Sequence, residues 1–136
     1  MIHSEMKEDP PLHILIVEDN TFLRHQFDEA FNHEFTISTA IGVEDGWQIY
    51  QNRNPDVVFV DIKLRDGSGH ELAHKIKEAG PTAFVVMATA SDRKEDKDEA
   101  IHNHVDDYIT KPFNRKKIVD SINRYWKTRS AAHILD

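Results

Sequence analysis

Three short, uninterrupted apolar runs constrain the fold of this chain more than any other feature of its sequence. They are residues 14–17, 57–60 and 84–87, and each is rich in β-branched or aromatic side chains. Each run is too short for a helix, and its apolar residues do not alternate with polar ones. This pattern is typical of strands that are buried on both faces, in a parallel sheet between two layers of helices.

Two further strands and five helical segments complete the pattern. Residues 35–38 alternate between apolar and polar side chains, which predicts an edge strand, and residues 105–109 are a mixed fifth candidate. Apolar residues recur at helical spacing in the intervening segments, except in residues 91–103, which are almost entirely charged and polar. Strands that alternate with helices predict an α/β fold with a doubly wound, five-stranded parallel sheet, (βα)5.

The size and charge of the chain indicate one domain that does not bind nucleic acid. Of the 136 residues, we expect 12–128 to form the domain, with an N-terminal tail (1–11) and a C-terminal tail or linker start (129–136). The net charge of −7 opposes binding to nucleic acid or to an anionic membrane. No cysteine and no long apolar stretch is present, which excludes disulfides, thiolate metal sites and a membrane-spanning helix. We therefore expect a soluble, cytoplasmic protein.

Polar side chains stand where the predicted strands end. They are Glu18 and Asp19 after the first buried run, Asp61 after the second, Thr89 after the third, and Lys111 after the fifth strand. Because the carboxyl ends of parallel strands meet at one edge of a sheet, we expect these side chains to converge. The carboxylates suit a hard cation such as Mg²⁺, while lysine supplies a positive charge and threonine a hydrogen-bond donor. Together they describe a phosphoryl-binding site in which a carboxylate can act as the nucleophile.

The segments around these residues resemble the receiver domains of bacterial two-component response regulators. The matching segments are residues 16–20 (Ile-Val-Glu-Asp-Asn), 61–64, 66–69, 88–90 (Ala-Thr-Ala) and 107–113, and the resemblance covers roughly residues 12–127. The resemblance implies the flavodoxin-like receiver fold, and the expected strand order 2-1-3-4-5 is taken from it.

The same resemblance implies the chemistry of the site. Asp61 would accept a phosphoryl group from a phosphohistidine on a histidine kinase or a phosphotransfer protein. Glu18, Asp19 and Asp61, with the backbone carbonyl of Lys63, would hold Mg²⁺, and Lys111 would pair with the phosphoryl group. The chain would then be a signalling domain that catalyses its own phosphorylation and dephosphorylates slowly, rather than an enzyme acting on other substrates.

The resemblance also implies how the signal leaves the site. Thr89 would hydrogen-bond the phosphoryl oxygen, Tyr108 would turn inward behind it, and the Lys111–Pro112 peptide bond would be cis. The fourth helix, the fifth strand and the fifth helix would form the output face, which contacts a downstream protein, an output domain beyond this chain, or a second copy in a homodimer. At His104 the sequence departs from the receiver family, in which glycine is usual at this position. A side chain there disfavours a left-handed backbone conformation. We expect the loop after the fourth helix to differ for this reason.

Two other classes of function compete with this interpretation. Residues 70–74, His-Glu-Leu-Ala-His, match the H-E-x-x-H motif of zinc peptidases. Leu72, Ile76 and Ala79 define the buried stripe of that helix, so we expect both histidines to face water, where no third ligand or cleft serves a catalytic zinc. The second alternative is a Mg²⁺-dependent phosphatase with an aspartyl-phosphate intermediate. Those enzymes usually carry a second aspartate two residues after the nucleophile, where this chain has Lys63.

Overall fold

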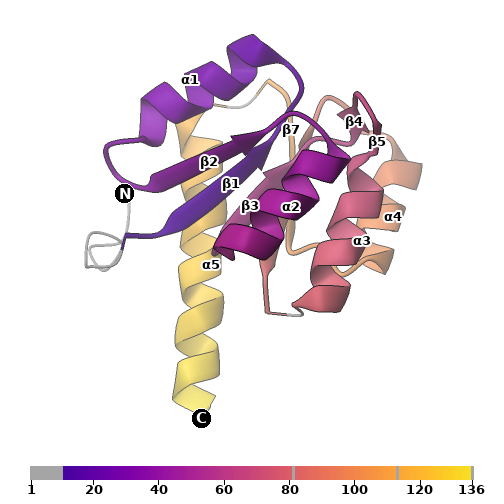
Figure 1. Cartoon of the computed structure of the whole chain (residues 1–136). Coiled ribbons are helices and arrows are strands. Elements are labelled where there is room, and N and C mark those ends of the chain that lie inside the picture. The colour runs from indigo at the N-terminus through magenta and orange to yellow at the C-terminus, as the bar shows by residue number, and fades with distance from the viewer. Residues whose placement is uncertain (1–10, 81, 113, 136) are drawn as a thin grey trace.

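The fold is built on a five-stranded parallel sheet (Figure 1). The computed structural model describes residues 11–80, 82–112 and 114–135, with side chains as far as residue 129. The strands of the sheet are β1 (His13–Val17), β2 (Thr36–Ala40), β3 (Val57–Val60), β6 (Phe84–Thr89) and β7 (Asp107–Thr110). They lie in the order β2-β1-β3-β6-β7, and every neighbouring pair is parallel. Counted along the chain this is the order 2-1-3-4-5, which confirms the predicted flavodoxin-like α/β fold.

Two layers of helices cover the sheet. The helices are α1 (Thr21–Phe31), α2 (Val43–Arg53), α3 (Gly69–Ala79), α4 (Lys94–His102) and α5 (Arg115–Leu135). One apolar core lies between the sheet and α1 with α5, and the other lies between the sheet and α2 with α3 (Figure 1). Within β1, Ile14 and Ile16 point into the first core, whereas Leu15 and Val17 point into the second. The unbroken apolar runs therefore reflect burial on both faces, as the sequence predicts.

The edge strands differ from the central strands in their burial. β2 alternates between exposed and buried residues along most of its length, and residues 107 and 108 of β7 are only half-buried. β7 begins at Asp107, two residues later than the predicted strand. The amide of Val105 donates instead to the carbonyl of Ala100 at 3.0 Å, so that residue closes the turn after α4.

A short antiparallel hairpin follows β3 and was not predicted. It consists of β4 (Lys63–Leu64) and β5 (Gly67–Ser68), each only two residues long. At its turn, the carboxylate of Asp66 accepts hydrogen bonds from the backbone amides of Val43 and Glu44 at 2.7 and 3.1 Å. Asp66 thus caps the N-terminus of α2 from a distant loop, where the N-cap residue Gly42 has no side chain.

The helix α4 is held to the domain mainly by polar contacts. Ala100 is its one buried residue, in agreement with the charged sequence of this segment. The loop that follows contains a left-handed residue, because His104 has φ 62°. A side chain was expected to disfavour that conformation, yet the chain adopts it and leaves His104 exposed to solvent.

The predicted tails, residues 1–11 and 129–136, lie at the two ends of the chain. The predicted N-terminal tail lies outside the described residues except for residue 11. α5 continues without a break to Leu135 and extends well beyond the sheet (Figure 1). The proposed boundary at residue 129 therefore has no counterpart in the secondary structure and stays a prediction. Among the described helices, none is both long enough and apolar enough to cross a membrane.

Candidate functional site: an acidic cluster at the strand ends

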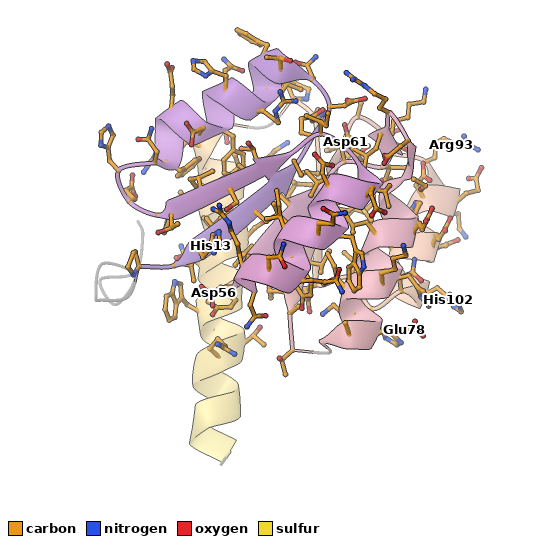
Figure 2. All side chains as sticks on the ribbon, in the orientation of Figure 1. His13, Asp56, Asp61, Glu78, Arg93 and His102 are labelled. Atoms are coloured by element: carbon orange, nitrogen blue, oxygen red, sulfur yellow. The ribbon has the colours of Figure 1, made fainter. Side chains whose placement is uncertain are left out.

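The sheet brings three carboxylates together at the carboxyl ends of β1 and β3. Glu18 and Asp19 follow β1, and Asp61 follows β3 directly. One oxygen atom from each of these side chains lies within 4.8 Å of the other two. The amide of Asp61 donates to the carbonyl of Val17 at 3.0 Å, so its backbone is fixed to the end of β1. Figure 2 shows Asp61 at this end of the sheet.

Lys111 reaches this cluster from the end of β7. Its Nζ atom lies 2.8 Å from Oδ2 of Asp61 and 2.5 Å from Oε1 of Glu18. Its backbone amide donates to the carbonyl of Thr89 at 2.8 Å, which ties the β7 end to the β6 end. The peptide bond between Lys111 and Pro112 is cis. The four residues that the sequence assigned to phosphoryl chemistry at these three strand ends therefore lie in one site.

Burial sets the electrostatics of the site. Burial raises the pKa of Glu18, and the neighbouring charge of Asp61 adds to this effect, although hydrogen bonds from Lys111 and Asn20 act in the opposite direction. Burial lowers the pKa of Lys111, but its hydrogen bonds to Asp61 and Glu18 outweigh burial, so that the net pKa is raised. The lysine is therefore held in its charged form, whereas the ionised form of Glu18 is destabilised.

The donor set fits a hard divalent cation. Three carboxylates carry more negative charge than one lysine neutralises, and oxygen-only ligands are those that Mg²⁺ prefers. The loop that carries them is fixed, because the amide of Asn20 donates to Glu18 Oε2 at 3.0 Å and Arg24 donates to the Glu18 carbonyl at 2.9 Å. Lys63, whose carbonyl was predicted as a further ligand, lies two residues beyond Asp61 with its side chain exposed.

Thr89 and Tyr108 meet at Ser91, on the side of the site that faces α4. Thr89 is buried at the end of β6, and its Oγ1 accepts a hydrogen bond from the amide of Ser91 at 3.4 Å. The hydroxyl of Tyr108 donates to the Ser91 carbonyl at 2.7 Å, and burial raises the pKa of Tyr108. Ser91 also donates its own hydroxyl to Asp96 in α4. The sequence indicated Thr89 and Tyr108, but it did not predict that Ser91 joins them to α4.

Gly69 supports the backbone of Asp61. Its amide donates to the carbonyl of Ile62 at 2.8 Å, and a β-carbon at this position would collide with the carbonyl oxygen of Asp61. This position therefore requires glycine for close approach rather than for an unusual φ angle. The residue before it, Ser68, caps α3 by accepting a hydrogen bond from the amide of His70 at 3.1 Å.

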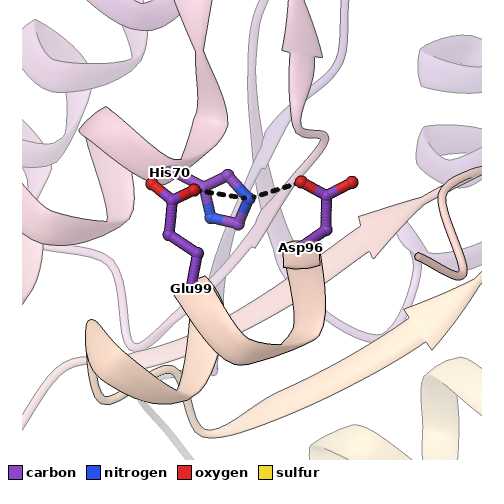
Figure 3. A group of neighbouring side chains, drawn as sticks. All are labelled: His70, Asp96 and Glu99. Carbon is purple, nitrogen blue, oxygen red and sulfur yellow. Dashed lines mark hydrogen bonds and ion pairs between the residues drawn. The ribbon is translucent and has the colours of Figure 1, made fainter. Parts of the chain in front are cut away.

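The H-E-x-x-H motif does not form a zinc peptidase site. His74 is exposed and lies 3.5 Å from Glu78, as expected for a residue that faces water. The same expectation is wrong for His70, which is only 4% exposed and directs Nε2 at Asp96 of α4 (Figure 3). The periodicity of α3 could not reveal this burial, because it is α4 that packs over the second face of α3.

A groove of about 470 Å³ opens beside the acidic cluster, between α1 and α5. Glu18, Asp61 and Lys111 lie at its polar end, and apolar side chains such as Phe27 and Ile118 line the rest. The site is therefore a pocket with one charged end and one apolar wall.

Known proteins share both the sequence and the fold of this chain. Residues 14–123 match the family model of the response regulator receiver domain. The chemotaxis protein CheY of Halobacterium salinarum is 33% identical over 112 residues, which cover 81% of this chain and 92% of that protein. The sensory transduction protein LytT of Bacillus anthracis is 32% identical over 123 residues, which cover 88% of this chain and 49% of LytT. The chain thus spans nearly the whole of one relative and about half of the other.

Solved structures give the same result. A beryllofluoride-activated DrrB receiver domain is 27% identical and superposes with a TM-score of 0.77, covering 85% of this chain and 97% of that domain. A CheY-like receiver domain protein of Methanospirillum hungatei, at 24% identity, has a TM-score of 0.85 and covers 89% and 98% of the two chains.

Proposed function

The chain belongs to the response regulator receiver domain family of two-component systems, and from this premise we propose that Asp61 accepts a phosphoryl group. The observation that carries the proposal is the position of Asp61, which is buried between Glu18, Asp19 and Lys111 at the end of β3. A carboxylate so placed has a cationic partner for the incoming group and an oxygen cluster suited to Mg²⁺.

The phosphoryl group would come from a phosphohistidine of a histidine kinase or a phosphotransfer protein. An oxygen of Asp61 attacks phosphorus, the P–N bond breaks, and the imidazole leaves with the bonding electron pair. Lys111 neutralises charge on the transferred group, since its Nζ atom already lies 2.8 Å from the nucleophile. Glu18, Asp19, Asp61 and the backbone carbonyl of Lys63 would hold Mg²⁺, which neutralises phosphoryl oxygens when bound. The donor histidine would reach Asp61 through the groove between α1 and α5.

Phosphorylation would be reported through Thr89 and Tyr108. The Oγ1 atom of Thr89 accepts a hydrogen bond from the amide of Ser91, and the same hydroxyl would donate to a phosphoryl oxygen on Asp61, which would move Thr89 relative to residue 91. Tyr108 contacts the carbonyl of the same serine, so a movement of residue 91 changes the surroundings of both side chains. The displacement would extend to α4, because Ser91 is also bonded to Asp96.

The output surface would be the face formed by α4, β7 and α5. The chain is acidic in α4, whereas the exposed cations of α5 are Arg115, Lys116, Lys117, Arg124, Lys127 and Arg129. This difference in charge supports pairing of two copies across a two-fold axis, or contact with a downstream protein or output domain. The chain matches only about half of LytT, so that relative has a further region outside the match.

Acetyl phosphate tests the central step without the partner kinase. We expect incubation of the purified chain with acetyl phosphate and Mg²⁺ to add one phosphoryl group, measured by intact mass. Asp61→Asn should abolish the adduct, and EDTA should prevent it in the wild type. Asp56→Asn is the matched control, because Asp56 lies at the opposite end of β3 and should leave phosphorylation unchanged (Figure 2). An adduct that persists in Asp61→Asn would overturn the proposal.

A further inference from the structure

His70, Asp96 and Glu99 form a second group of ligand-type side chains, away from the acidic cluster (Figure 3). Nε2 of His70 lies 3.1 Å from Oδ1 of Asp96 and 3.8 Å from Oε1 of Glu99. One ligand atom from each residue lies within 4.8 Å of the other two. The group joins the first turn of α3 to α4, and none of its members belongs to the site around Asp61.

The positions of these residues in their helices create the convergence. Asp96 and Glu99 are three residues apart in α4, so both carboxylates lie on the same face of that helix. Glycine and serine precede His70 at the start of α3, where Asn103 also donates to the His70 carbonyl at 3.5 Å. The two carboxylates on this face of α4 therefore lie next to the single imidazole of His70 in α3.

Among the residues that the structure describes, the imidazole has polar contacts only with these carboxylates. Only 5% of the His70 side chain is exposed, and its Nδ1 atom is buried without a hydrogen-bond partner among the described residues. A neutral imidazole offers at most one N–H at Nε2, which cannot neutralise two carboxylates. Arg93 and Lys94 make their ion pairs with Glu95 and Asp98, although the charge of Arg93 also acts on Asp96. The group thus combines a buried nitrogen ligand with an excess of negative charge.

We propose that His70, Asp96 and Glu99 bind a divalent transition-metal ion of the Zn²⁺ type between α3 and α4. One nitrogen and two carboxylate oxygens form a mixed donor set that suits Zn²⁺ better than Mg²⁺. Metal–ligand bonds of about 2.0–2.2 Å would span the observed separations of 3.1 and 3.8 Å with small side-chain adjustments. Exposure rises from 5% for His70 to 22% for Asp96 and 55% for Glu99, so the ion has a route from solvent and room for water ligands.

The strength of binding follows from the same contacts. A ring that coordinates through Nε2 carries its proton on Nδ1, and that N–H would be buried without a partner. A hydrogen-bond partner on the second ring nitrogen strengthens the binding of a metal ion by histidine. Because His70 lacks such a partner among the described residues, we expect micromolar affinity for Zn²⁺ rather than the tighter binding of structural zinc centres.

A bound ion would clamp α4 to α3. The helix otherwise buries only Ala100, so an additional link between the helices should slow its local opening. Asp96 also accepts a hydrogen bond from Ser91, which contacts Thr89 and Tyr108. The proposed metal site does not depend on the proposed function. Any influence of the ion on phosphorylation does rest on the proposed function.

Competition against a chromophoric zinc chelator, with excess Mg²⁺ present, tests the site. We expect one equivalent of Zn²⁺ to bind wild type and Asp61→Asn alike, and Glu99→Gln and His70→Ala to weaken binding at least about 10-fold. Glu99 is more than half exposed, so its substitution tests the site even if His70→Ala fails to fold. The controls are His74→Ala, in the same motif, and Glu95→Gln, in the same helix, and both should bind as the wild type does.

Hydrogen exchange measures the clamp directly. Saturating Zn²⁺ should slow amide exchange in residues 94–102 of the wild type but not of Glu99→Gln. The proposal is overturned if the wild type binds no stoichiometric Zn²⁺, or if Glu99→Gln binds as tightly as the wild type. It is also overturned if binding is lost in Asp61→Asn but kept in Glu99→Gln, which would place the ion in the acidic cluster. Failure of phosphorylation with retained Zn²⁺ binding would reject the proposed function alone.

Discussion

The Nζ atom of Lys111 lies 2.8 Å from Oδ2 of Asp61, and only 18% and 9% of the two side chains are exposed. The two residues are separated by 50 positions in the sequence, and the ends of β3 and β7 bring them together. Because Glu18 shares the same lysine, one cation balances two carboxylates in a largely buried position.

Removal of this cation should destabilise the protein. We expect Lys111→Met to lower the free energy of unfolding by about 3 kcal/mol, because two buried carboxylates would lose their partner. Urea denaturation without divalent cations measures the loss, and added Mg²⁺ should restore part of it. Lys116→Met is the matched control: its partner Asp120 is also a carboxylate, but the lysine is 81% exposed and the expected change is below about 0.5 kcal/mol. Equal losses in the two variants would contradict the prediction.

Glu18 should make the metal-free protein less stable as the pH rises. Burial raises its pKa in the folded state, so its contribution to stability is complete below the ordinary value of 4.5 and is lost as the pH rises through the folded pKa. We expect Glu18→Gln to raise the midpoint of thermal unfolding by a few degrees at neutral pH. The gain should shrink at acidic pH, where the wild-type carboxyl is protonated. A gain that does not vary with pH would show that ionisation is not its cause.

Asp66 should have the opposite pH dependence. Hydrogen bonds from the amides of Val43 and Glu44 lower its pKa, so its contribution is present above the ordinary value of 3.8 and is lost as the pH falls through the folded pKa. Asp66→Asn should therefore flatten the acid limb of the stability–pH profile, measured by urea denaturation. Asp92→Asn, in an exposed position, is the control and should leave that limb unchanged.

The left-handed residue after α4 offers a stabilising substitution. His104 has φ 62° and an exposed side chain, so His104→Gly removes backbone strain and little packing. We expect a gain of about 0.5–1 kcal/mol in the free energy of unfolding. Asn54→Gly is the control at φ 49°, because asparagine tolerates this region and should gain less. A loss of stability in His104→Gly would mean that the histidine side chain makes a favourable contact that outweighs the strain.

Activation should change the assembly of the protein if the output face pairs with itself. We expect beryllofluoride with Mg²⁺ to double the mass measured by light scattering, and Asp61→Asn to remain at the monomer mass. Lys117→Glu, in the basic part of α5, should weaken the dimer without preventing phosphorylation by acetyl phosphate. Unchanged mass of the wild type would reject the homodimer and leave a downstream protein or an output domain as the target.

The central strands and the acidic cluster could be predicted because their signals are local. The runs ending at Val17, Val60 and Met87 are apolar without interruption, and the residues that follow them carry the chemistry. The predicted start of the edge strand β7 was wrong by two residues, because Val105 is apolar but closes the turn after α4. Periodicity identifies one buried face of a helix and contains no information about a second neighbour.

The missed features depend on contacts between distant segments. The burial of His70 results from the packing of α4 against α3, and the capping of α2 by Asp66 crosses more than 20 positions of the chain. The hairpin of β4 and β5 is too short to leave a pattern of alternating side chains. Each of these contacts becomes visible only once the order of the strands has placed the intervening loops.

The weak apolar anchoring of α4 has a consequence for how the protein can change. Eight of its nine positions lie outside the apolar core, and substitutions at the exposed ones, which do not include Asp96, cost the domain little in folding. Substitutions in α4 can therefore change which partner protein binds this surface, while the residues at the strand ends keep their chemistry. A library that randomises the exposed positions of α4, except for Asp96 and Glu99, would retain most of its members as folded proteins and is a practical starting point for redirecting the signal to a new target.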